Sequence, residues 1–285
     1  MIKIAIVILN YNSAADCQKC VSFLKRQTGV ESEIILVDNC SQPEDATLVK
    51  QLAEEQGVTF IAANENRGYN AGNNIGLRYA ADKGYKYALI ANPDMEFPQT
   101  DYLKRMIIKM EEDEQIVVCG SNIVTPEGVH QNPRSYKMKQ WWHSFDWIRG
   151  MLHHGNQENV PDWIADPYIS HFCKGVNGCC FLIRMNFVTQ IFFFDERIFL
   201  YGEESILARQ VEVSGKKMYY FAEVTAVHDH KKSREGNVQF RFTHWKHSQL
   251  HNIKYYSGFP VYGKWFAILS TQLYFLVLHL HTKMR

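Results

Sequence analysis

The sequence lacks both of the common phosphate-binding loops. No GxGxxG follows the first apolar run, and GxxxxGK[ST] occurs nowhere in the 285 residues. Each of these loops uses glycine to bring backbone N–H groups against the phosphates of a dinucleotide or of ATP. A nicotinamide-dependent oxidoreductase and a P-loop ATPase are therefore disfavoured.

An excess of charge is absent as well. The chain has 31 Lys and Arg against 30 Asp and Glu, without blocks of like charge, so nothing indicates nucleic acid as a partner. Its seven cysteines are odd in number and irregularly spaced, which argues against a disulfide framework. The lone CxxC of Cys17 and Cys20 falls in a predicted helix, so we expect neither zinc nor redox chemistry there. The apolar run of MIKIAIVILNYN is too short for a signal peptide, and we expect an intracellular protein.

Apolar, β-branched runs do occur, and they alternate with helix-like segments. The runs predict buried strands within 3–12, 32–41, 58–63 and 85–97, later within 116–128 and 174–184. Helices are predicted over 13–27, 44–56, 74–84, 101–113, 203–214 and 264–281, the first opened by a capping box of Ser13 and Asp16. This alternation predicts an α/β fold with a largely parallel sheet.

Polar clusters follow the first four predicted strands. They are Asn10-Tyr11-Asn12, Asp38-Asn39, the stretch 64–72 and Asn92-Pro93-Asp94. In open α/β sheets ligands bind beyond the carboxyl ends of the strands. We therefore expect these four clusters to converge on one edge of the sheet.

The stretch NENRGYNAGNNIGL, residues 64–77, contains three glycines spaced four apart and one arginine. Backbone amides at the start of a helix, with Arg67 beside them, suit an anionic ligand such as a diphosphate. A plain loop with a helix cap is the alternative at this point.

Seven short motifs, taken in order, resemble those of family 2 glycosyltransferases, in particular the bacterial rhamnosyltransferase-like branch. They are ILNYN, VDNCS, NRGYNAGNNIGL, NPDMEF, VNGCCFLIR, FFFDERIFLYGEE and VHDHKKS, from about residue 3 to 233. Each motif is weak alone, and the ordered set is specific. The resemblance implies the GT-A fold, an α/β domain with a mainly parallel central sheet and helices on both faces.

By the same resemblance the donor is a nucleotide sugar. A carboxylate at Asp38 can accept a pyrimidine N3–H, which favours uridine or thymidine, although Asp38 could equally be a strand-end turn residue. The donor-binding residues implied are Asn10, Tyr11, Asn12, Asp38, Asn39, Arg67, Gly68, Gly72, Asn92 and Asp94.

The segment Asn92-Pro93-Asp94 stands where the family has its DxD-type motif, which implies that Asp94 binds Mn²⁺ or Mg²⁺. Asn92 departs from that motif, and Glu96 is the nearby substitute for the missing carboxylate. His228 matches a family histidine near the metal or the diphosphate, with His230 as the alternative.

An inverting transferase needs one carboxylate to take the proton of the acceptor hydroxyl. FDERIFLYGEESILARQ resembles the family's FDExFFxYxEDxDLxxR and leaves the base open between Glu203 and Glu204, with Glu204 preferred. The later acid of the motif is Ile206 here. Two acids at a helix start can also simply favour the helix dipole.

Asp195 and Glu196 of the same motif are expected to shape the acceptor side rather than to do chemistry. Four tryptophans in the irregular segment 130–170 are either acceptor surface or core. They are Trp141, Trp142, Trp147 and Trp163.

We expect a GT-A domain over 1–240, with a nucleotide-sugar-binding half (1–100) and an acceptor-binding and catalytic half (101–240), followed by a C-terminal helical segment (241–285). The apolar stretch 265–280 spans about 24 Å as a helix, short of the roughly 30 Å of a hydrocarbon core. It is therefore interpreted as an interfacial helix contacting a membrane through 264–282, a homodimer contact, or a buried core helix.

The expected function is inverting, metal-dependent transfer of a sugar, from dTDP-rhamnose or a UDP-sugar. The acceptor is expected to be a cell-surface polysaccharide or a lipid-linked glycan at the inner face of the cell membrane. The Asn92 and Ile206 departures leave a second possibility, a catalytically silent glycan- or nucleotide-binding homologue.

Overall fold

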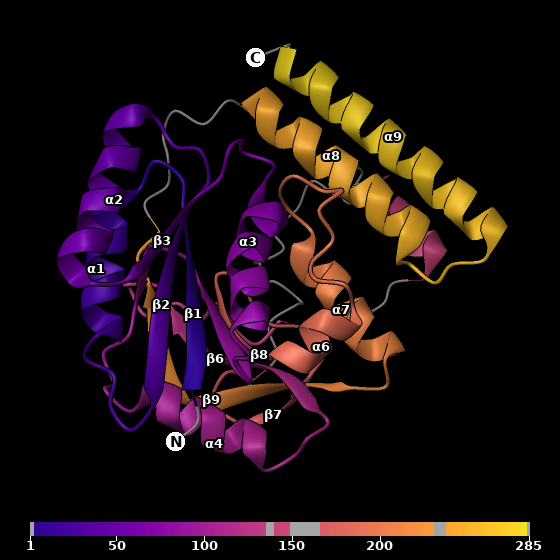
Figure 1. The fold of residues 1–285 in the computed structure, drawn as a ribbon. Coiled ribbons are helices and arrows are strands. Elements are labelled where there is room, and N and C mark those ends of the chain that lie inside the picture. The colour runs from indigo at the N-terminus through magenta and orange to yellow at the C-terminus, as the bar shows by residue number, and fades with distance from the viewer. Residues whose placement is uncertain (1–2, 135–139, 149–165, 231–237, 284–285) are drawn as a thin grey trace.

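The computed structural model describes residues 3–134, 140–148, 166–230 and 238–283. A nine-stranded sheet in the order β3-β2-β1-β4-β8-β6-β9-β5, with β7 also paired to β9, runs through the centre (Figure 1). The first four strands of that order are mutually parallel, and β6 and β9 run the same way. The strands are β1 (Lys3–Asn10), β2 (Glu31–Asp38), β3 (Thr59–Ala62), β4 (Tyr87–Ala91), β5 (Met95–Glu96), β6 (Ile116–Val124), β7 (His171–Cys173), β8 (Cys180–Arg184) and β9 (Lys217–His228).

Helices cover both faces of this sheet because its central strands are apolar on both sides. In β1 the side chains of Ile4, Ile6 and Ile8 belong to one buried cluster, whereas Ala5, Val7 and Leu9 belong to the other. The first cluster includes residues of α1 (Ala14–Leu24), α2 (Pro43–Gln56) and α4 (Tyr102–Glu111). The second includes residues of α3 (Tyr69–Asp82), α6 (Met185–Gln190) and α7 (Glu203–Val213). The strict alternation explains why these strands read as continuous apolar runs.

Helix α3 lies unusually close to the sheet because glycine faces β1. A Cβ atom on Gly72 would lie 2.5 Å from Leu9 Cδ1, and one on Gly76 would lie 2.5 Å from Val7 Cγ1. The helix also begins at Tyr69, five residues before the predicted start at 74. Its first turns are rich in Asn and Gly, which are weak helix formers, and tertiary contacts stabilise them instead.

The predicted capping box at the start of α1 is wrong. Ser13 makes no cap hydrogen bond to the helix; its hydroxyl donates to Asn10 Oδ1, and the Ala14 N–H is taken by Asp45 Oδ1 at 2.9 Å. Side chains from the neighbouring loop thus satisfy the orphan donors that a local cap would otherwise satisfy.

Two long antiparallel helices follow the sheet, α8 (Val238–Tyr255) and α9 (Val261–Lys283) (Figure 1). Helix α8 packs on the loop 195–201, where the His244 ring stacks on Phe199 and Ser248 Oγ donates to Leu200 O. Helix α9 packs against α8 and against the short helix η1 (Trp141–Phe145). The loop that leads into α7 is therefore covered by the C-terminal hairpin.

Candidate active site

The predicted convergence of strand-end residues occurs first at β1 and β2. The amide nitrogen of Asn10 lies 2.9 Å from Asp38 Oδ1 and 2.8 Å from Asp45 Oδ2. Asp38 is 3% exposed, and its second oxygen accepts the Ser41 N–H. Asp38 therefore already holds the turn together, while Tyr11 beside it is half exposed.

The glycine-rich stretch joins the same edge. Asn39 Nδ2 donates to Asn66 Oδ1, and the Gly68 N–H donates to that same oxygen. The next amide, Tyr69 N–H, donates to Phe199 O at 2.9 Å. Two of the backbone donors expected to face an anion are thus satisfied within the protein.

Asp94, His228 and His230 form a cluster of possible metal ligands, with one ligand atom of each within 4.8 Å of the others. Asp94 Oδ2 lies 3.3 Å from His228 Nε2 and 3.1 Å from His230 Nδ1. The pairing of β5 with β9, which places Met95 opposite His228, and the Asp229 N–H bond to Asp94 O fix this juxtaposition. Residues far apart in the sequence are therefore brought to one point by the sheet itself.

Two buried atoms of this cluster, Asp94 Oδ1 and His228 Nε2, have no hydrogen-bond partner among the described residues. His228 Nδ1 lies 2.7 Å from Gln131 Oε1 and donates to it, which leaves the lone pair on Nε2. A histidine that ligates a metal usually has its other ring nitrogen held in this way. Burial raises the pKa of Asp94, but contacts with His228 and His230 outweigh it and hold that pKa below its ordinary value. An anionic oxygen and two imidazole nitrogens fit a divalent cation.

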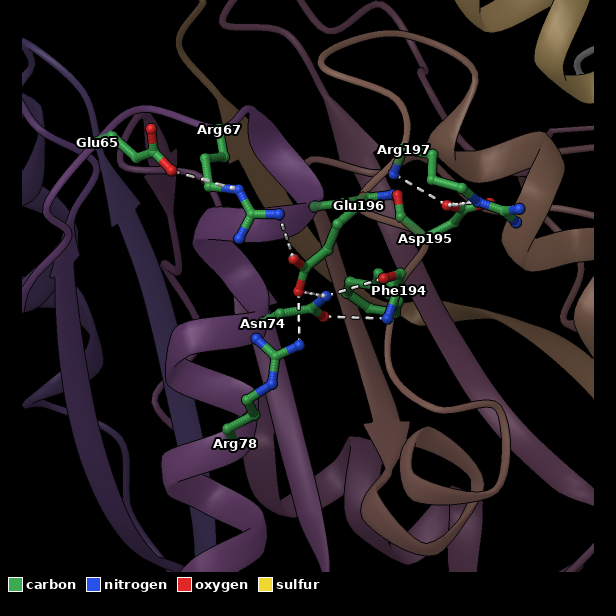
Figure 2. Close-up of polar contacts among 9 residues, drawn as sticks. Glu65, Arg67, Asn74, Arg78, Phe194, Asp195, Glu196 and Arg197 are labelled. Carbon is green, nitrogen blue, oxygen red and sulfur yellow. Dashed lines mark hydrogen bonds and ion pairs between the residues drawn. The ribbon is translucent and has the colours of Figure 1, made fainter.

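Two residues with predicted roles in cation or diphosphate binding lie outside this cluster. Glu96, the expected substitute carboxylate, forms an ion pair with Lys19 at 2.5 Å. Arg67 points at Glu196, with Nη2 3.3 Å from Oε2, and its Nε lies 3.7 Å from Glu65 (Figure 2). Arg67 is 57% exposed, so these are surface ion pairs.

A short relay of contacts connects Asn92 to the predicted base. The Tyr69 hydroxyl lies 3.0 Å from Asn92 Oδ1 and 2.8 Å from Gly178 O. The Gly178 N–H in turn donates to Glu204 Oε1 at 3.2 Å. Sequence analysis did not single out Tyr69 or Gly178, although both lie within the motifs NRGYNAGNNIGL and VNGCCFLIR.

The two adjacent glutamates at the start of α7 occupy different environments. Glu204 accepts the Gly178 N–H, and Arg134 Nη1 lies 3.7 Å from its Oε1. Glu203 Oε2 is buried and has no partner among the described residues, and burial together with the charge of Glu204 raises the pKa of Glu203 to about 8. By these contacts Glu204 is the better placed of the two to receive a proton.

Both glutamates line a cavity of about 650 Å³ between α7 and α8, here called the base cavity. Its other walls include Arg134, Arg241, Trp245 and Gln249. A cavity of this size accommodates a small ligand. The sequence carried no signal for the contribution of α8, because its lining residues belong to no recognised motif.

Asp195 and Glu196 point in opposite directions and anchor the loop between α6 and α7 (Figure 2). Glu196 accepts hydrogen bonds from Asn74 and Arg78 of α3. Asp195 accepts from Arg197, and also from two residues of the hairpin region, His251 at 2.8 Å and Tyr256 at 2.8 Å. Burial opposes ionisation of Asp195, but these donors outweigh it and hold its pKa far below the ordinary value. The loop is thereby fixed to α3 on one side and to α8 on the other.

Two of the four tryptophans pack η1 and the residues after it onto α9. Trp141 stacks on Phe266, and Trp147 Nε1 donates to Ser270 Oγ. Trp142 is 52% exposed, and Trp163 lies outside the described residues. Packing, rather than acceptor contact, accounts for the two that are placed against a helix.

The mainly parallel central sheet, covered by helices on both faces, has the GT-A architecture, so the predicted fold class is confirmed. The chain belongs to glycosyl transferase family 2, whose model matches residues 5–187. A solved mannosyltransferase of Pyrobaculum calidifontis in complex with GDP-Man and Mn²⁺ superposes with a TM-score of 0.61, at 16% identity, over 95% of this chain and 69% of its own.

Two curated relatives belong to glycan assembly. The low-salt glycan biosynthesis hexosyltransferase Agl10 of Haloferax volcanii is 26% identical over 202 residues, which are 70% of this chain and 59% of that protein. The succinoglycan biosynthesis protein ExoO of Rhizobium meliloti is 30% identical over 126 residues, 44% of this chain and 35% of that protein. The chain thus matches between about one third and three fifths of the length of these relatives.

Proposed function

We propose that this protein transfers a sugar, with inversion, from a nucleoside diphosphate donor to a glycan acceptor, with the aid of a divalent cation. The observation that carries the proposal is the cluster of Asp94, His228 and His230. Its atoms Asp94 Oδ1 and His228 Nε2 have no hydrogen-bond partner among the described residues, and the cluster lies beyond the carboxyl ends of the strands. A hydrogen-bonded relay through Tyr69 and Gly178 connects this edge to Glu204.

Asp94 and His228 would hold Mn²⁺ or Mg²⁺, with His230 as a further ligand. When bound, the cation neutralises the charge that develops on the leaving diphosphate. Arg67 is exposed and held only by surface ion pairs, which contribute little, so it is available to the diphosphate. Gly68 and Gly72 then act indirectly, because they allow the close packing that positions Arg67.

The nucleoside would lie against the turn Asn10–Asn12, where Tyr11 offers an exposed ring for stacking on the base. Asp38 has lone pairs beyond those used by Asn10 and Ser41, and can accept a pyrimidine N3–H. This supports uridine or thymidine diphosphate sugars, dTDP-rhamnose among them, with Asn39 and Asn92 completing the donor contacts.

The acceptor hydroxyl attacks the anomeric carbon as the bond to the diphosphate breaks, and Glu204 takes the hydroxyl proton. This displacement is direct, so no covalent sugar–enzyme bond is needed and the anomeric configuration inverts. Glu203 keeps its own proton near neutral pH because its pKa is raised to about 8.

The C-terminal hairpin supports an acceptor at a membrane surface. Helix α9 contains a stretch, Val261–Leu280, that by length and composition could cross a membrane, which corrects the estimate that it is too short. Only 22% of the apolar segment within this stretch is buried, so α9 is not a core helix of the described structure. All 30 acidic residues of the chain precede Gly236, whereas six of the 31 Lys and Arg residues follow it. An apolar helix in an acid-free basic segment favours peripheral contact with anionic lipid at the inner face of the cell membrane.

Thermal unfolding with a panel of nucleotide sugars, each with and without Mn²⁺, tests the proposal. A ligand at 100 times its dissociation constant stabilises by about 2.7 kcal/mol, which is a measurable shift. We expect a Mn²⁺-dependent shift with a uridine or thymidine diphosphate sugar. Asp94→Asn should abolish the metal dependence, whereas Glu204→Gln should keep the shift and lose turnover.

The matched control is Glu96→Gln, which removes a carboxylate that lies two residues from Asp94 but outside the cluster. It should retain the metal-dependent shift. No shift with any nucleotide sugar would overturn the proposal, and a shift without turnover across donors and acceptors would identify a silent homologue instead.

A further inference from the structure

A second cavity of about 790 Å³ adjoins the base cavity. Ser205 of α7 and Gln249 of α8 line both, so the two cavities are contiguous and are here called the groove; residues of β7 and β9 also line its far part. It starts at Glu203 and Glu204 and extends past Tyr256 to Phe259. Either cavity alone is large enough for a small ligand, and the joined groove is larger than one sugar requires.

One stripe of α8 forms the wall of this groove along its whole length. The lining residues recur every three or four positions, the spacing of a single helical face. In order from the glutamates they are Phe242, Trp245, Gln249 and Asn252 of α8, and Tyr256 just after its end. Two rings, two amides and a further ring thus follow one another along the groove. Aromatic rings stack on the apolar faces of sugars, and amides offer both donors and acceptors to hydroxyls.

The two amides in this stripe are not committed to the protein. Among the residues that the structure describes, no hydrogen bond of the Gln249 or Asn252 side chain is found, and both residues are half-buried. Amides inside the fold behave differently: Asn70 and Asn74, for example, are bonded to backbone carbonyls of the loop before α7. The groove therefore holds hydrogen-bonding capacity without using it internally.

The position of this wall is fixed. His251 and Tyr256 both bond Asp195, and the Arg197 guanidinium bonds the same carboxylate. These contacts join α8 to the loop that leads into α7. They therefore hold the lining residues of α8 at a fixed distance from Glu203 and Glu204. Such a preformed wall lowers the entropic cost of binding an extended ligand.

We propose that the groove between α7 and α8 binds the acceptor as a linear oligosaccharide, several sugar residues long. The terminal sugar lies in the base cavity beside Glu204, and the preceding residues extend along α8 toward Phe259. This inference rests on the proposed transferase function, because it is the proton of a terminal hydroxyl that Glu204 accepts.

An array of bacterial mono- to hexasaccharides, probed with the full-length protein, tests the groove directly. The wild type should bind glycans of three or more residues better than their mono- and disaccharide parts. A hydrogen bond contributes about 3- to 10-fold in affinity, so Gln249→Ala with Asn252→Ala should weaken long glycans about 10-fold or more. Asn252→Ala alone, which changes only the second cavity, should leave binding of the short glycans unchanged.

Gln51→Ala, which removes an exposed amide from α2, is the matched control and should bind like the wild type. The proposal would be overturned if short and long glycans bound equally, if the double variant bound long glycans like the wild type, or if no glycan on the array were bound. Failure of the transferase function would be distinct, since it appears as the absence of any nucleotide-sugar shift in thermal unfolding. Turnover that continues without length dependence would refute only the groove.

Discussion

At the scale of single residues, the two glutamates at the start of α7 show how adjacent identical side chains come to lie in different surroundings. Glu204 meets a backbone N–H and a guanidinium, whereas Glu203 Oε2 is buried and has no partner among the described residues. The pKa of Glu203 therefore rises from 4.5 to about 8. The native state keeps a proton that the unfolded chain releases between these pH values.

The raised pKa predicts a specific pH dependence of stability. Its contribution is fully present below about pH 4.5 and is lost as the pH rises through about 8. At about 1.4 kcal/mol per pKa unit, the free energy of unfolding should fall by about 3 kcal/mol or more over this window. Glu203→Gln should remove most of this fall, as measured by urea unfolding at the two ends of the window.

Glu212→Gln is the control, because Glu212 is on the same helix but half exposed. It should keep the wild-type pH dependence. If Glu203→Gln and the wild type lose stability in parallel, the raised pKa of Glu203 is wrong.

At the scale of elements, the entry to α3 depends on a glycine for a reason other than phosphate binding. Gly68 has a φ of +98°, and a Cβ there would lie 2.2 Å from Phe199 O. The close approach lets the Tyr69 N–H reach that oxygen and holds the loop before α7 against α3. Gly68 therefore joins the start of α3 to the segment that leads into α7.

Gly68→Ala should lower the free energy of unfolding by more than the unfavourable backbone conformation of alanine alone would. Gly84→Ala is the matched control, because Gly84 also has a positive φ of +72° but open space around its Cα. A left-handed conformation such as that of Gly84 costs about 1–2 kcal/mol for alanine. Gly68, with φ +98° and ψ −178°, lies in a region essentially confined to glycine, and a clash that moves the backbone adds about 1–3 kcal/mol. Urea unfolding of both variants measures the difference, and equal losses would contradict the clash.

The elements also show what the sequence could predict. Strands such as β1 and β4, and helix α7, were predicted because the pattern of their apolar residues is strong. The convergence of polar residues at one edge of the sheet was expected because parallel strands end at the same edge. The start of α3 was missed, since its Asn and Gly residues are stabilised by contacts with Phe194 and Phe199, distant in sequence. The stripe of α8 was missed because its rings and amides together form no apolar face. The proximity of Asp94 and His228 could be predicted because both follow strands, whereas the contacts of Gln131 and His251 could not.

At the scale of the whole molecule, α9 presents an exposed apolar face among the described residues. Its exposed side chains are Val261, Tyr262, Trp265, Phe266, Leu269, Leu273, Leu276 and Leu280. They lie on a different side of α9 from residues such as Ala267 and Ser270, which are buried. The proposed membrane contact therefore falls on this exposed side of α9.

The whole-molecule prediction is that vesicle binding depends on this face. Trp265→Ser with Leu269→Ser should reduce co-flotation with vesicles of anionic phospholipid by about 10-fold or more, because two large apolar side chains are lost. Leu48→Ser, which changes an equally exposed leucine on α2, should not. Unchanged flotation of the double variant would contradict membrane contact, and dimer dissociation in its place would assign the face to a second copy.

The pairing of β5 with β9 has a consequence for synthesis of the protein. His230 lies 136 residues after Asp94, and β9 is the last strand of the sheet to leave the ribosome. A nascent chain that has emerged only through β5 holds Asp94 but neither of the two imidazoles beside it. The cluster of Asp94, His228 and His230 can therefore assemble only after β9 has joined the sheet, and a chain truncated before β9 would lack it.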